Sequence, residues 1–166
     1  MNSLFTPVNG CLNGNPMIFR DNLKKWSYVI ACVWFICLIG HGNEMYQYSH
    51  YGAGAISSIV IEMICSVVLV IISYRIANNI NISQNINSYD IHLLTDSARS
   101  LYILYTIFIS IYMVVNLIQY LSVVIFLQPI TIIICSLLYL LWLFGSIIYV
   151  RHIWSYSLHL ENGSLE

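Results

Sequence analysis

The sequence predicts an all-α, polytopic membrane protein: an antiparallel bundle of four transmembrane helices with both chain ends in the cytoplasm. Three observations lead to this prediction. Hydrophobic residue types make up 59% of the 166 residues and charged types only 8%, whereas a soluble domain carries about 25% charged residues. Four apolar segments are long enough, or nearly so, to cross a bilayer. All six basic residues fall on one side of the membrane if these segments are four spans.

The predicted organisation places a transmembrane domain at 26–151 between two short cytoplasmic ends, at 1–25 and 152–166. The first two spans are separated by a short polar segment rich in Tyr and Gly. A cytoplasmic loop at 77–98 joins the second and third spans. The last two spans are divided at Pro129, because Gln128-Pro129 is the only credible turn in the final apolar stretch. The four spans therefore cover 26–42, 54–76, 100–123 and 129–150.

The basic residues set the direction of insertion, because loops on the cytoplasmic side carry an excess of Lys and Arg. The opposite side, at 41–53 and at the turn before Pro129, has none. In the alternative in which the short first span is a cleaved signal peptide, three spans remain in the same orientation. We expect an integral protein of a bacterial inner membrane or plasma membrane. The basic residues, all on the predicted inner side, are Arg20, Lys24, Lys25, Arg75, Arg99 and Arg151.

Small residues recur every four positions along one face of the second span. Transmembrane helices associate through small residues that let their backbones approach, and through hydrogen bonds between helices. We therefore expect Gly54, Ser58 and Ser66 to form a helix-packing stripe. The third and fourth spans each carry a comparable polar or small stripe opposite a back of Ile, Leu and Val.

Glu62 is the only formally charged side chain well inside a predicted span. A carboxylate at that depth costs about 2.5 kcal/mol or more and is by default a functional hypothesis. Asn116 lies at a similar depth on the third span, which predicts an intramembrane polar cluster joined by Gln119 or Tyr139. Two interpretations stay open: a site for a proton, a cation or a partner helix, or a protonated Glu that bonds neighbouring helices.

Patterns typical of catalysis or cofactor binding are missing. There is no Cys-x-x-Cys, phosphate loop, nucleophile triad or pair of catalytic carboxylates. His41, Glu44 and His50 cluster in the predicted outer segment, but their spacing matches no tight metal motif. We expect no metal, no cofactor and no enzymatic activity. A net charge of −1 with six basic residues also excludes a basic nucleic-acid-binding face.

The small size, the short loops and the polar helix faces favour helix–helix recognition of another membrane protein, or of a second copy in a homo-oligomer. The partners expected are therefore the lipid bilayer and a membrane protein. Four spans with both ends inside, in so small a chain, are similar to the immunity proteins that protect bacteria from pore-forming bacteriocins and to plasmid exclusion proteins of the inner membrane. The resemblance implies an accessory, inhibitory, immunity or exclusion role. The alternative is a subunit of a small oligomeric transporter or channel that uses Glu62.

Overall fold

The chain is all-helical over the residues that the computed structural model describes, which are 16–48, 53–83, 91–123 and 128–161. Each helix has 31 to 33 residues and is therefore about 50 Å long, against a hydrocarbon core of about 30 Å. All four are long and apolar enough to cross a membrane. This confirms an all-α chain with four candidate spans and indicates an integral, multi-pass protein. The helices are α1 (Pro16–Tyr48), α2 (Ala53–Ser83), α3 (Ile91–Val123) and α4 (Pro129–Glu161).

The helices extend beyond the predicted spans, mostly at the end that carries the basic residues. The predicted N-terminal segment is helical from Pro16, a residue well suited to the first turn of a helix. The predicted loop at 77–98 is helical at 77–83 and at 91–98, and the predicted tail is helical as far as Glu161. Mean hydropathy marks only the part of a helix that sits in lipid, so it misses turns that continue into polar surroundings.

Those extra turns are stabilised by contacts between helices. Asn79 of α2 donates to the Leu94 carbonyl of α3 at 3.5 Å and accepts a hydrogen bond from Tyr156 of α4 at 3.0 Å. The same end contains an ion pair between Arg99 and Glu161. Asn79 therefore forms a buried hydrogen-bonded link between three helices.

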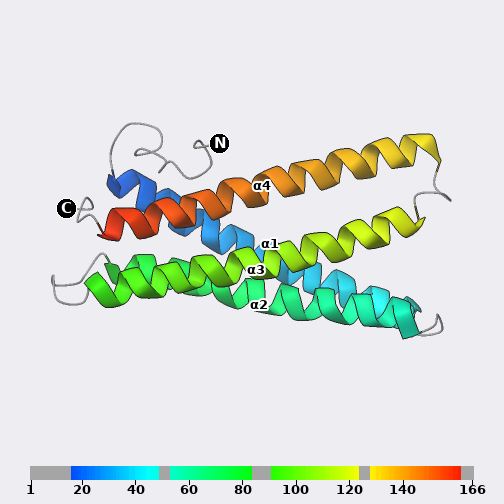
Figure 1. Cartoon of the computed structure of the whole chain (residues 1–166), viewed down its shortest axis with the longest axis horizontal. Coiled ribbons are helices and arrows are strands. Elements are labelled where there is room, and N and C mark those ends of the chain that lie inside the picture. The colour runs from blue at the N-terminus through cyan, green and yellow to red at the C-terminus, as the bar shows by residue number, and fades with distance from the viewer. Residues whose placement is uncertain (1–15, 49–52, 84–90, 124–127, 162–166) are drawn as a thin grey trace.

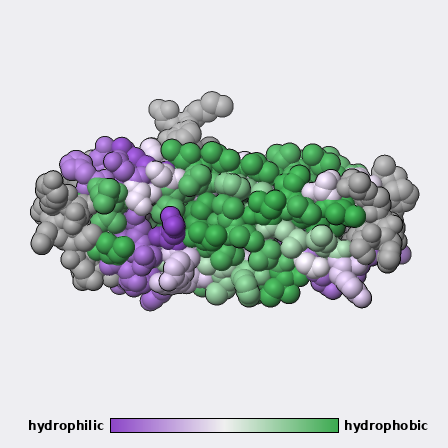
Figure 2. Space-filling model, turned by 90° about the horizontal axis from the view of Figure 1, so that it is seen from below, coloured by the Kyte–Doolittle hydropathy of each residue, from purple (hydrophilic) through white to green (hydrophobic). Residues whose placement is uncertain are grey.

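The four helices lie lengthwise along the molecule (Figure 1). α1 packs most extensively on α2, and α3 lies between α2 and α4. α1 crosses the bundle diagonally: its beginning lies near the end of α4, whereas its own end lies beside α2. Phe19 accordingly stacks on His152, with ring centroids 5.8 Å apart. The face seen in Figure 2 has a wide apolar belt, with hydrophilic residues gathered mostly towards the end where α1 begins and α4 ends.

α4 is buried along only part of its length. Its buried residues all lie between Tyr149 and Leu160. The outer half of α4, residues 129–148, contains no buried residue although the structure describes all of it. This half diverges from α1 (Figure 1).

Candidate functional site

Glu62 lies within the bundle, between α1 and α3, and is 0% exposed. Its neighbours along α2 share its face, because residues four apart on an α-helix lie above one another. Of the predicted stripe, Ser66 is fully buried and Ser58 is half-buried. Gly54 belongs to α2, but its surroundings lie outside the described residues. The four-residue spacing thus directs Glu62 and two of the small residues into the bundle.

Two amides on α3 bind the Glu62 carboxyl group. Asn116 Nδ2 donates to Oε1 at 2.7 Å, and Gln119 Nε2 donates to Oε2 at 3.2 Å. Gln119 also donates to the Ser58 hydroxyl oxygen at 2.9 Å. Because Asn116 and Gln119 are three residues apart, they point from one face of α3 towards α2. Both carboxyl oxygens of Glu62 therefore accept a hydrogen bond inside the bundle.

α1 brings a third group to the same carboxyl. His41 Nδ1 lies 3.6 Å from Glu62 Oε2 and 3.2 Å from Glu44 Oε2. The other ring nitrogen, Nε2, lies 3.1 Å from the Tyr112 hydroxyl. The side chain of His41 is 11% exposed and that of Glu44 is 50% exposed. The imidazole therefore stands between a buried carboxyl and one that reaches the surface.

Tyr139 does not join this group, and here the structure corrects the expectation. Its hydroxyl donates instead to the Met113 carbonyl of α3 at 3.1 Å. The reason is the position of α4, which packs on α3 and leaves its outer half away from the rest of the bundle. Similar depth in the membrane was therefore not enough to bring Tyr139 to Glu62.

Sequence reasoning missed the role of His41 and Tyr112. His41 was expected in an outer loop together with Glu44 and His50. The structure continues α1 to Tyr48, so His41 and Glu44 are one helical turn apart, while His50 lies outside the described residues. Two spacings in the sequence could have revealed these roles. His41 and Glu44 lie three residues apart and Tyr112 and Asn116 lie four apart, so each pair shares a helix face.

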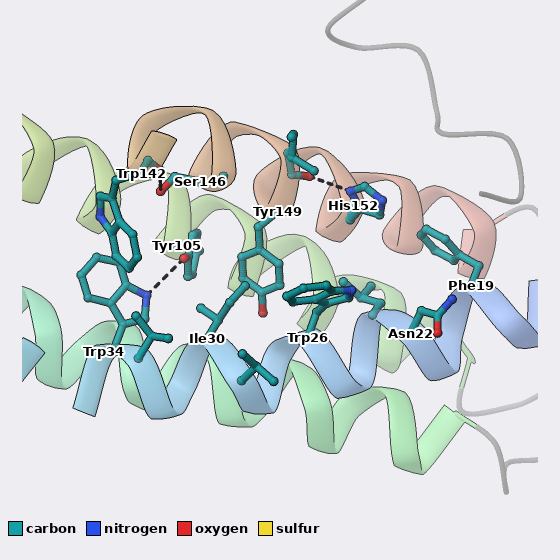
Figure 3. Close-up of a pocket in the computed structure, with 15 residues that line it drawn as sticks. Phe19, Asn22, Trp26, Ile30, Trp34, Tyr105, Trp142, Ser146, Tyr149 and His152 are labelled. Atoms are coloured by element: carbon teal, nitrogen blue, oxygen red, sulfur yellow. Dashed lines mark hydrogen bonds between the residues drawn. The ribbon is translucent and has the colours of Figure 1, made fainter. Parts of the chain in front are cut away.

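A separate apolar groove of about 490 Å³ lies between α1 and α4 (Figure 3). Trp26 and Ile30 of α1 face Tyr149 of α4 across it, and Trp34 and Trp142 meet at one end. Two of the aromatic polar groups there are paired internally: Trp34 donates to the Tyr105 hydroxyl at 3.3 Å, and Tyr149 donates to the Ser27 hydroxyl at 2.8 Å. The remaining lining is mostly carbon, which suits an apolar occupant.

In the part of the chain that the structure describes, four candidate membrane-spanning helices enclose a hydrogen-bonded carboxyl group, which indicates an integral multi-pass membrane protein. No protein-family model, curated protein or solved structure matches the chain.

Proposed function

We propose that the protein acts by helix–helix recognition of another membrane protein, without catalysis, and that α4 provides the recognition surface. The observation that carries the proposal is the outer half of α4, which is the longest stretch without a buried residue in the described parts of the four helices. We call its exposed apolar side chains the α4 face. They are Ile130, Ile133, Ile134, Leu137, Leu138, Leu141 and Phe144.

The groove beside this face can admit a helix closely. Gly145 and Ser146 line the groove on the α4 side. A Cβ atom added at Gly145 would meet no other atom within 4 Å. Small residues are the points at which transmembrane helices approach each other, because lipid offers no hydrophobic force to bring them together. By contrast, the polar side chains of Asn116 and Gln119 are already engaged with Glu62.

The same proposal includes the arrangement in the membrane. We infer an antiparallel bundle with both ends in the cytoplasm of a bacterial inner membrane or plasma membrane. The support is the set of six basic residues, all of which lie within the helices, towards the end where α1 begins and α4 ends. Contacts such as those of Lys24 with Asn81 and of Arg99 with Glu161 join the helices at that end. In this orientation the outer half of α4 lies in the half of the membrane away from the cytoplasm and meets its partner there.

Site-specific photocrosslinking in native membranes tests the recognition surface. A photoreactive residue at Ile133 or Leu137 should give a discrete adduct, whereas one at Ile64 of α2, equally exposed to lipid, should give none. Gly145→Ile should lower the yield at Leu137 by about tenfold, the effect of losing about 1.4 kcal/mol of association energy. An adduct of twice 19.1 kDa identifies a second copy. Equal crosslinking from α2 and α4, unaffected by Gly145→Ile, contradicts the proposal.

A second candidate function, a subunit of an oligomeric transporter or channel, is favoured by one observation. His41 connects the exposed Glu44 with the buried Glu62, so ionisable groups lead from the outer surface into the span. Glu62→Gln separates the two functions. Loss of ion flux in proteoliposomes with unchanged crosslinking supports transport, whereas unchanged flux with an unchanged adduct supports recognition through the α4 face.

A further inference from the structure

We propose that His41, Glu44 and Glu62 form a binding site for a divalent transition-metal cation at the outer end of α1 and α2. The three side chains each direct one ligand atom to the same place, and these atoms all lie within 4.8 Å of one another. This proposal departs from the expectation of no metal. Glu62 completes the ligand set, and because it is distant in sequence from His41 and Glu44, their spacing alone did not indicate a site. It does not depend on the helix-recognition proposal.

The spacing of the ligand atoms suits a small cation. In tetrahedral zinc sites the metal–ligand bonds of about 2.0–2.2 Å place neighbouring ligand atoms about 3.3–3.5 Å apart. His41 Nδ1 lies 3.2 Å from Glu44 Oε2 and 3.6 Å from Glu62 Oε2, close to that separation. The two carboxylate oxygens, at most 4.8 Å apart, must come closer by about 1 Å. Glu44 can supply this movement because half of its side chain is exposed.

Hydrogen-bonding neighbours orient these ligands, as the neighbours of the ligands do in metal sites. Ligating histidines usually bond a second group through the other ring nitrogen, which fixes the tautomer. Here Nε2 of His41 lies 3.1 Å from the Tyr112 hydroxyl, and a proton on Nε2 leaves the Nδ1 lone pair directed at the two carboxylates. Asn116 and Gln119 donate to the Glu62 carboxylate and hold it in place. Two of the three ligands are therefore positioned before a cation arrives.

The charge of the site points to a divalent ion. Two carboxylates and a neutral imidazole carry a charge of about −2, which one divalent cation would cancel. This compensation matters most for Glu62, whose side chain is 1% exposed. A nitrogen ligand with two oxygens suits Zn²⁺ and its first-row neighbours, whereas Ca²⁺ and Mg²⁺ prefer oxygen alone. Three protein ligands leave a fourth position for water or for a group from a partner.

Titration of the full chain in detergent, without a histidine tag and after removal of metals, tests the site. Calorimetry with Zn²⁺ should give one ion per chain, and Co²⁺ should give the visible absorption of a tetrahedral centre. His41→Asn and Glu44→Gln should each weaken Zn²⁺ binding by about tenfold to 100-fold, and Asn116→Leu by about tenfold. His92→Asn, at an exposed histidine of α3 near the exposed Asp96, is the matched control and should change nothing.

Two results would overturn the proposal. One is a wild-type chain that binds no Zn²⁺ more tightly than the His41→Asn variant does. The other is equal weakening by His92→Asn, which would indicate general surface binding. Glu44→Gln keeps the test decisive if variants in the bundle interior fail to fold, because Glu44 is half exposed and its loss leaves the Glu62 hydrogen bonds intact.

Discussion

Asn116 and Glu62 lie 54 residues apart in the sequence and share a hydrogen bond inside the bundle. A buried polar group that loses its partner retains the cost of its removal from water, about 1–3 kcal/mol in soluble proteins. Measured interhelical hydrogen bonds in membranes average about 0.6 kcal/mol, because the separated helices also find partners. At the scale of single residues, the Glu62 cluster should therefore make a modest but measurable contribution to stability.

Asn116→Leu should lower the free energy of unfolding by about 0.5–2 kcal/mol, since Glu62 Oε1 then loses its donor. Unfolding by sodium dodecyl sulfate in mixed micelles, followed by circular dichroism, measures the change. Asn43→Leu, at an exposed asparagine of α1, is the matched control and should have little effect. If both variants were equally stable, Asn116 would not stabilise the bundle through Glu62.

At the scale of elements, α4 combines a docked half, which contains its buried residues, with an outer half whose side chains are half-buried or exposed. The docked half packs Ile153 and Tyr156 into the core, with exposed fractions of 0% and 1%. It is also tied to α1 through the hydrogen bond from Tyr149 to Ser27. The outer half contacts α3 through side chains such as Tyr139 and presents Ile133, which is 61% exposed. Stability and recognition should therefore depend on different halves of one helix.

Ile153→Ala should destabilise the isolated chain by about 1–3 kcal/mol, because it leaves a cavity that the surrounding helices fill only in part. Ile133→Ala should leave stability unchanged and weaken the adduct formed through the α4 face. The unfolding assay and the crosslinking yield together measure both effects. Equal destabilisation by the two variants would mean that the outer half of α4 packs within the bundle.

At the scale of the whole molecule, the polar end of the surface coincides with the basic residues and the apolar belt covers most of the remaining length (Figure 2). We propose from the positive-inside rule that the polar end faces the cytoplasm. The helices are longer than the hydrocarbon core is thick, so their ends reach aqueous surroundings on both sides. Residues near the two ends should therefore differ in their accessibility to reagents outside the cell.

A membrane-impermeant maleimide should label Gln47→Cys in intact cells and should label Ser164→Cys only after permeabilisation, in a chain whose Cys11 is replaced by Ser. Gln47 is exposed near the end of α1, and Ser164 belongs to the predicted cytoplasmic tail. The intact mass of the purified chain, 19.1 kDa if the first span is retained, tests the signal-peptide alternative. Labelling of Ser164→Cys in intact cells would contradict the proposed orientation.

Part of the Glu62 site could be read from spacing along single helices. The four-residue interval from Ser58 to Glu62 and the three-residue interval from Asn116 to Gln119 each define one helix face. The structure brings these two faces together. The same reasoning misplaced Tyr139 and assigned His41 to a loop, because neither the tilt of α4 nor the end of α1 is encoded in the periodicity of a single segment.

The sequence by itself determined that the chain is all-helical with four apolar segments, because the scarcity of charge and the length of those segments reflect the cost of placing polar groups in lipid. Only the tertiary structure decided which side chains share a site. The crossing of α1 over the bundle places His41 beside Glu62, and the packing of α4 on α3 keeps Tyr139 out of the cluster. The physical reason is that helix crossings depend on the packing of side chains from different helices, which hydropathy does not describe.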